Sequence, residues 1–146
     1  MDYKLLVLLI CSYILAFSIN MMPALKHPDL NLNVFNLFVS IILLIVLLIY
    51  TRKGNNKLKV FSIIGVISGV LIFTIKTFEN SMFDHTFWDT IASIQYPFYL
   101  IFTTPLFGLN ILFDLNYATY SLLLSLFYFL VFILAVNTKK NDSQNV

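Results

Sequence analysis

The sequence predicts an all-α polytopic membrane protein. The chain is 60% hydrophobic and 11% charged, whereas a soluble domain is roughly 25% charged. Its mean hydropathy is +0.88, and between residues 90 and 138 the only formal charge is Asp114. A soluble domain of this composition would expose large apolar patches and aggregate, so we expect the chain to lie in a lipid bilayer.

Four apolar segments are long enough to cross a bilayer as helices, which takes about 20 residues. They cover about residues 5–22, 33–50, 60–77 and 116–136, and none has a charged residue in its interior. Pro23 is expected to end the first helix. We expect this helix to be retained and not cleaved as a signal peptide, because Asp2 offsets Lys4 and the apolar run continues past Ser18. A polar tail, residues 137–146, completes a single membrane domain.

The basic residues predict the orientation, because they favour the cytoplasmic side of a membrane. With four spans and a cytoplasmic N-terminus, only Lys26 and Lys76 lie outside. The other seven of the nine basic residues lie inside: Lys4, Arg52, Lys53, Lys57, Lys59, Lys139 and Lys140. We therefore expect a multi-pass protein of the cell membrane with both termini in the cytoplasm.

Residues 96–113 form an apolar stretch that is almost long enough for a fifth span. Pro105 and Gly108 interrupt its middle, however, and a fifth span would place Lys139 and Lys140 outside, leaving five basic residues inside and four outside. We favour a re-entrant or interfacial segment that leans on the other helices, because irregular backbone at membrane depth must be surrounded by protein or water. Five transmembrane helices are the alternative.

An amphipathic helix is expected before this stretch, at about residues 82–94. Apolar side chains recur there at helical spacing, and polar side chains occupy the other face. The apolar set is Phe83, Phe87, Ile91 and Ile94, and the polar set is Asp84, His85, Asp89 and Ser93. With Trp88 at headgroup depth, this helix is expected to lie in the outer membrane interface.

Gly65 and Gly69 form a GxxxG pattern on the third span. Glycines four residues apart share a helix face and let another backbone approach closely. Two interpretations remain open at this level. The face mediates self-association, or it packs against another helix of the same chain.

His85 and Asp89 are four residues apart and would share a helix face beside Asp84. A metal site would need further ligands, and a catalytic pair would need a nucleophile, which the neighbouring sequence does not supply. A solvated polar face is the simpler interpretation. We therefore predict no metal, no cofactor and no catalytic residue.

Several polar residues in and after the interrupted stretch are candidates for lining a path or contacting a partner. They are Thr103, Thr104, Pro105 and Asn110, followed by Asp114. The alternative for the hydroxyl and amide side chains is that they bond backbone groups freed by the proline. Asp114 is expected in a turn or as a cap of the last helix, a role for which Asn116 competes.

The sequence excludes more functions than it identifies. The spans carry no buried acids or bases of the kind that ion-coupled transport uses, and there is no arginine ladder, phosphate-binding loop or CxxC pair. The small net charge of +2 argues against nucleic-acid binding. A single arginine among many Ile, Phe, Asn and Lys residues suggests AT-rich coding and a bacterial source.

Two hypotheses of function follow. The first is a small non-catalytic membrane protein that binds another membrane protein, or itself through Gly65 and Gly69, as an accessory, regulatory or immunity-type protein. The second is a transporter or channel component whose path is lined by the re-entrant segment. The lipid bilayer is a partner in both.

Overall fold

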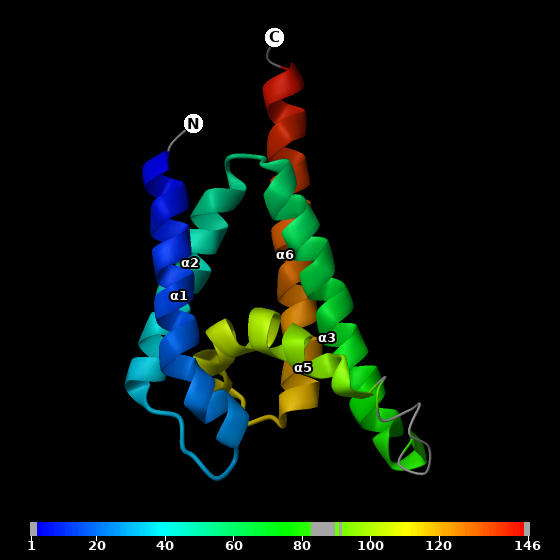
Figure 1. The fold of residues 1–146 in the computed structure, drawn as a ribbon. Coiled ribbons are helices and arrows are strands. Elements are labelled where there is room, and N and C mark those ends of the chain that lie inside the picture. Colours follow the sequence, from blue (N-terminus) through cyan, green and yellow to red (C-terminus); the bar gives the residue numbers. More distant parts are fainter. Residues whose placement is uncertain (1–2, 83–89, 91, 145–146) are drawn as a thin grey trace.

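In a computed structural model, the chain folds into a helical bundle (Figure 1). The structure describes residues 3–82, 90 and 92–144. Within these residues, four helices are long and apolar enough to cross a membrane. They are α1 (Tyr3–Lys26), α2 (Val34–Thr51), α3 (Asn56–Met82) and α6 (Tyr117–Gln144). This confirms the predicted all-helical chain with four segments able to span a membrane.

Between α3 and α6 lies the interrupted segment, which we define as Gln95–Leu112. It consists of α5 (Gln95–Phe98), the π-helix η1 (Tyr99–Thr103) and the 3-10 helix η2 (Thr104–Leu112). Three successive helix types in 18 residues show that no single hydrogen-bond register runs through this stretch. The helix type changes between Thr103 and Thr104, directly before Pro105.

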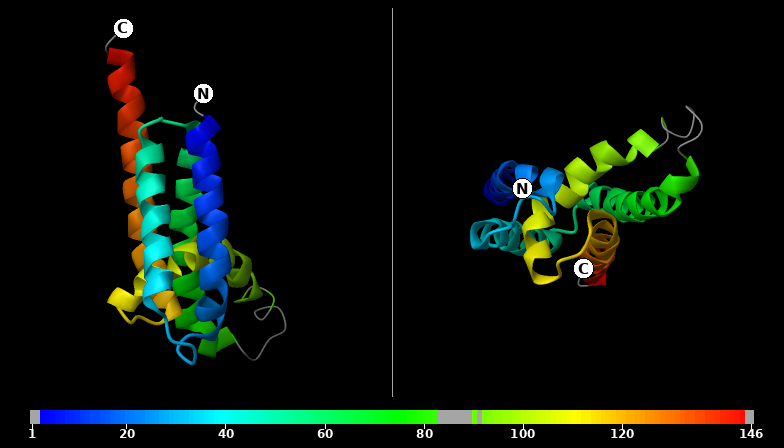
Figure 2. Two further views of the ribbon diagram at one scale, coloured as in Figure 1. Left: turned by 90° about the vertical axis from the view of Figure 1, so that its left-hand side faces the viewer. Right: turned by 90° about the horizontal axis from the view of Figure 1, so that it is seen from below.

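The bundle is built from two helix pairs, α1 with α2 and α3 with α6 (Figure 1). The interrupted segment runs from one pair to the other, because η2 packs on α1 and α2 while α5 and η1 pack on α3. Seen from below, it crosses between the pairs (Figure 2). The interrupted segment therefore contacts both helix pairs.

The two ends of the bundle differ in charge. Both termini and the α2–α3 turn lie at one end, which we call the basic end because it carries Lys4, Arg52, Lys53, Lys57 and Lys59 (Figure 1). The interrupted segment lies toward the opposite, distal end. Among carboxylate side chains that the structure describes, Asp29 and Asp114 are both in distal connections.

The first helix continues past Pro23 to Lys26, so the predicted end at Pro23 is wrong. A helical proline has no N–H to offer the carbonyl four residues earlier, which here is that of Ile19. The Asn36 side-chain amide on α2 donates to this Ile19 carbonyl at 3.2 Å. Because a neighbouring helix supplies the missing donor, α1 can accommodate the proline.

Candidate functional site

Pro105 has no N–H, so a carbonyl of the preceding turn loses its helical donor, and side chains of other helices donate to the carbonyls of this turn. An α-helical N–H at position 105 would reach the Ile101 carbonyl, and a 3-10 N–H would reach that of Phe102. The Tyr13 hydroxyl on α1 donates to the Ile101 carbonyl, and the Tyr128 hydroxyl on α6 donates to the Phe102 carbonyl, each at 2.8 Å. Two tyrosines from opposite helix pairs therefore replace the donor that proline lacks.

Other carbonyls of the segment are bonded in the same way. The Tyr120 hydroxyl on α6 donates to the Leu106 carbonyl at 2.6 Å, and the Ser68 hydroxyl on α3 donates to that of Phe98 at 3.3 Å. In the reverse direction, the Tyr99 hydroxyl of the segment donates to the Ala24 carbonyl of α1 at 2.8 Å. The segment is thus fixed to its neighbours through its backbone.

Asn20 is the centre of a buried polar network that joins α1, α2 and η2. Its amide donates to the Ser40 hydroxyl at 2.8 Å and to the Pro105 carbonyl at 3.0 Å. Its own oxygen accepts from the Asn36 amide at 3.0 Å. Ser40 donates to the same Pro105 carbonyl at 3.2 Å. Asn20 is fully buried, and these bonds use both of its N–H groups and its oxygen.

Gly108 lets η2 approach α2 at this network. A Cβ at position 108 would overlap the Asn36 backbone carbonyl and would lie 2.6 Å from the Ser40 hydroxyl oxygen. The obstacle is backbone, which cannot move aside as a flexible side chain can. Glycine is therefore required here by close packing.

The predicted path residues Thr103, Thr104, Pro105 and Asn110 are all at most 2% exposed. The Thr103 hydroxyl lies 3.0 Å from that of Ser121 on α6, and Thr104 donates to the Tyr99 carbonyl at 3.3 Å. Asn110 closes the turn before α6, donating to the Leu115 carbonyl at 2.7 Å and accepting from its N–H at 3.1 Å. The polar groups of these side chains bond to protein atoms.

Asp114 lies in the turn that leads into α6. Its φ of 49° is left-handed, a conformation that Asp and Asn tolerate better than most residues. Its side chain is 95% exposed, with one carboxylate oxygen 3.9 Å from Nε2 of His27. Asn116 accepts from the Thr119 N–H at 2.9 Å and caps α6. Asp114 is therefore a turn residue, and Asn116, the alternative candidate, is the N-cap of α6.

Gly65 and Gly69 face α6 of the same chain. A Cβ on Gly65 would lie 2.6 Å from the Tyr128 ring, and a Cβ on Gly69 would overlap the Ser121 carbonyl. The glycine face is occupied within the bundle, as in the second of the two interpretations above. A second chain cannot use this face while α6 occupies it.

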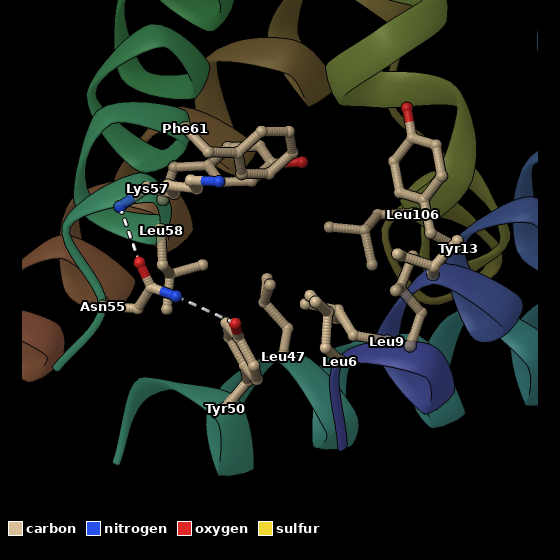
Figure 3. Close-up of a pocket in the computed structure, with 13 residues that line it drawn as sticks. Leu6, Leu9, Tyr13, Leu47, Tyr50, Asn55, Lys57, Leu58, Phe61 and Leu106 are labelled. Atoms are coloured by element: carbon tan, nitrogen blue, oxygen red, sulfur yellow. Dashed lines mark hydrogen bonds between the residues drawn. The ribbon is translucent and has the colours of Figure 1, made fainter. Parts of the chain in front are cut away.

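A cavity of about 520 Å³ lies in the basic half of the bundle (Figure 3). This size falls within the range of roughly 300–1,000 Å³ that is typical of ligand pockets. Its walls are mainly apolar and come from both helix pairs, with Leu6, Leu9, Leu47, Leu58 and Phe61 among the lining residues. Leu106 of the interrupted segment also lines the cavity, on the same side as Tyr13 (Figure 3), and Tyr128 of α6 is a further lining residue.

Helices α1 and α3 both line the cavity but are not packed on each other. α1 packs on α2, α2 contacts α6 and α6 packs on α3, but α1 makes no contact of comparable extent with α3. Leu6, Leu9 and Ile10 of α1 line the cavity, and Ile10 is also exposed on the outer surface.

Three polar residues line the cavity toward the basic end. The Asn55 amide donates to the Tyr50 hydroxyl at 3.0 Å, and the Lys57 N–H donates to the Asn55 side-chain oxygen at 2.8 Å. The Lys57 side chain extends toward the cavity beside Phe61 (Figure 3). The Tyr50 oxygen accepts a bond, so its own proton remains available to a ligand.

The predicted outer helix falls largely outside the described residues. Asp84, His85, Trp88 and Asp89 all belong to the part of the chain that the structure does not describe, so their proposed surface stays a prediction. Among described residues, no three His, Cys, Asp or Glu side chains come close enough to hold a metal ion.

Two parts of the site were not predicted from the sequence. Asn20 is a polar residue near the end of an apolar helix, and Asn36 and Ser40 are polar residues four apart near the start of the next helix. Polar residues at the facing ends of two consecutive apolar helices could have predicted this network. The second part is the set of tyrosines whose hydroxyls donate to backbone carbonyls: Tyr13, Tyr99, Tyr120 and Tyr128. The sequence does not distinguish these tyrosines, because a tyrosine in an apolar segment fits the hydrophobic pattern like any other apolar residue.

The comparisons with known proteins give no relative. No protein-family model matches the chain, no curated protein matches it, and no solved structure matches its fold. The case for its function therefore depends on the geometry of this chain.

Proposed function

We propose that this is a non-catalytic integral membrane protein that acts by binding, in an accessory, regulatory or immunity-type role. The observation that carries the proposal is the cavity between the two helix pairs. Its walls are mainly apolar, helices α1 and α3 line it without packing on each other, and Leu106 of the interrupted segment also lines it. Such a site suits an apolar chain or segment that enters laterally from the membrane.

The proposed placement is in the cell membrane with the basic end in the cytoplasm, as the distribution of basic residues favours. The interrupted segment is then re-entrant from the outer side. Single cysteines at Ser143 and Asn116, in a Cys11→Ser background, test this arrangement by labelling from each side. We expect Ser143 to be labelled from the cytoplasm and Asn116 from outside. The opposite pattern would refute the orientation.

Transport along the interrupted segment has less support. A path would need polar groups that face an open channel, whereas Thr103, Thr104 and Asn110 are buried and bonded to protein atoms. This function would require the segment to move and those bonds to break. Solute flux in proteoliposomes that is lost with Thr104→Val and Asn110→Leu would favour transport over binding.

Photocrosslinking tests the binding proposal directly. A diazirine amino acid placed at Leu9 lines the cavity, and the same group at Leu8 lies on the exposed face of α1 at nearly the same depth. After illumination in native membranes, we expect one dominant adduct at Leu9, identified by its mass. At Leu8 we expect a mixture that reflects the bulk lipid.

The neighbouring Leu8 position is the matched control, because it shares helix, depth and chemistry with Leu9. Equal adducts in equal yield at both positions would mean that the cavity selects nothing, and the binding proposal would then fail.

A further inference from the structure

We infer that the occupant of the cavity is an anionic membrane lipid, with an acyl chain between the helix pairs and its phosphate at Lys57. This inference depends on the proposed function, because it names the ligand of the same site. Three features of the cavity support it: the shape and chemistry of its walls, the polar groups at its basic end, and the charges of the surrounding surface.

The walls suit an acyl chain better than a polar solute. The cavity is lined by leucines, Phe61 and Ile10 over its depth, and its polar side chains lie at the basic end or already bond protein carbonyls. Tyr13 and Tyr128 are both committed to the interrupted segment in this way. A polar molecule in the distal part of the cavity would lose its hydrogen bonds to water without replacement.

The basic end of the cavity offers donors and positive charge to an anion. Lys57 supplies an ammonium group, for which no acidic partner is found among the described residues. The Tyr50 hydroxyl can donate its proton, and the Asn55 amide has a second N–H beyond the one that bonds Tyr50. These groups match the oxygens of a phosphodiester, which accept from ammonium, hydroxyl and amide donors.

The surrounding charges favour a negative headgroup. Lys4, Arg52, Lys53 and Lys59 lie at the same end of the bundle as Lys57. The described carboxylates, Asp29 and Asp114, are at the distal end. Basic residues near a membrane surface attract anionic lipids. A zwitterionic headgroup would gain less, because its own cation would be repelled.

The test compares two lipids that differ only in the headgroup. The full-length protein is reconstituted with phosphatidylglycerol and phosphatidylcholine of identical chains, and lipids retained after mild delipidation are counted by native mass spectrometry. We expect phosphatidylglycerol to be retained preferentially. Lys57→Gln should lower its apparent affinity about tenfold, because the substitution removes a charge-assisted hydrogen bond to the phosphate as well as one surface charge, and should lower the retention of phosphatidylcholine less.

Two further variants make the result specific. Lys59→Gln removes the same charge at the same end of the bundle, but Lys59 does not line the cavity, so only the general attraction is lost and retention should fall clearly less than with Lys57→Gln. Leu9→Trp fills the apolar part and should lower retention of both lipids. Leu6→Trp serves the same purpose if Leu9→Trp does not fold.

Distinct outcomes would overturn the inference. Equal effects of Lys57→Gln and Lys59→Gln would indicate general surface attraction and no phosphate site. Equal retention of both lipids, abolished by Leu9→Trp, would reject the anionic headgroup while leaving the proposed binding function intact. A cavity adduct that proves to be a protein segment would reject the lipid itself. Retention that does not change with Leu9→Trp would reject both proposals.

Discussion

The distal and basic halves of this bundle are built from the same four helices but are packed in different ways. In the distal half, the interrupted segment fills the space between the helix pairs and is bonded to all four helices. In the basic half, the space between the same pairs is a cavity with apolar walls. The two halves therefore differ in that irregular backbone lies between the helix pairs in the distal half and not in the basic half.

Irregular backbone in an apolar environment requires hydrogen-bond partners, because each unsatisfied group costs several kcal/mol. The tyrosines, Asn20 and Ser40 supply those partners and thereby fix the two helix pairs to one segment. Regular helices satisfy their own backbone and require nothing from each other. In the basic half only regular helices of the two pairs face each other, and a cavity remains between the pairs.

The largest effect is expected from Gly108→Val in the distal half. The added side chain would overlap the Asn36 backbone carbonyl, so we expect a loss of about 3 kcal/mol in the free energy of unfolding, the upper range for overpacking. Reversible unfolding in mixed micelles measures it. Leu112→Ala, at an exposed position of the same segment, should change stability by less than about 0.5 kcal/mol. Similar values for the two variants would show that the contact is not tight.

Asn20→Leu should have the next largest effect. It removes three hydrogen bonds that join α1, α2 and η2, and with about 0.6 kcal/mol for each such bond in a membrane we expect a loss of about 2 kcal/mol. Ser18→Ala, whose exposed hydroxyl bonds only within α1, is the control and should be near neutral. A neutral Asn20→Leu would mean that the network does not hold the distal half together.

The link between Tyr13 and Pro105 predicts a smaller, specific coupling. Tyr13→Phe removes the donor to the Ile101 carbonyl, and we expect a loss of about 1 kcal/mol. Pro105→Ala restores an N–H that can reach this carbonyl, so Tyr13→Phe should have less effect in that background. A double-mutant cycle on unfolding free energies measures the difference.

Tyr96→Phe is the control for the tyrosine hydroxyl, since Tyr96 is exposed at the start of the same segment. Additive effects of Tyr13→Phe and Pro105→Ala would contradict the view that the tyrosine replaces the proline's missing donor.

The smallest effect is expected from filling the basic half. Leu9→Trp adds volume to an existing cavity and should change stability by less than about 1 kcal/mol. Val39→Trp makes a comparable insertion on α2 in the distal half, where the side chain is buried in the core, and should cost about 1–3 kcal/mol. If the two variants were equally destabilising, the contrast between the halves would disappear.

Much of the architecture could be predicted from sequence. Uninterrupted apolar length identifies α1, α2, α3 and α6, because the bilayer thickness sets a length that few other elements share. Pro105 and Gly108 marked the interruption, because proline cannot continue a helical hydrogen-bond register. Pro23 has the same chemistry, but α1 continues past it because Asn36 on another helix supplies the missing donor.

That the chain is apolar, helical and interrupted near Pro105 follows from the sequence alone, because hydropathy, length and proline chemistry are local properties. The tertiary structure, in contrast, selects the side chains that replace the missing donor, since Tyr13 and Ile101 are 88 residues apart and their contact depends on how the helices pack. It also decided where the bundle stays open. Cavities depend on how well packed surfaces fit together. A row of leucines has the same sequence pattern whether it faces a protein core, a lipid or a bound ligand, so the pattern does not predict a cavity.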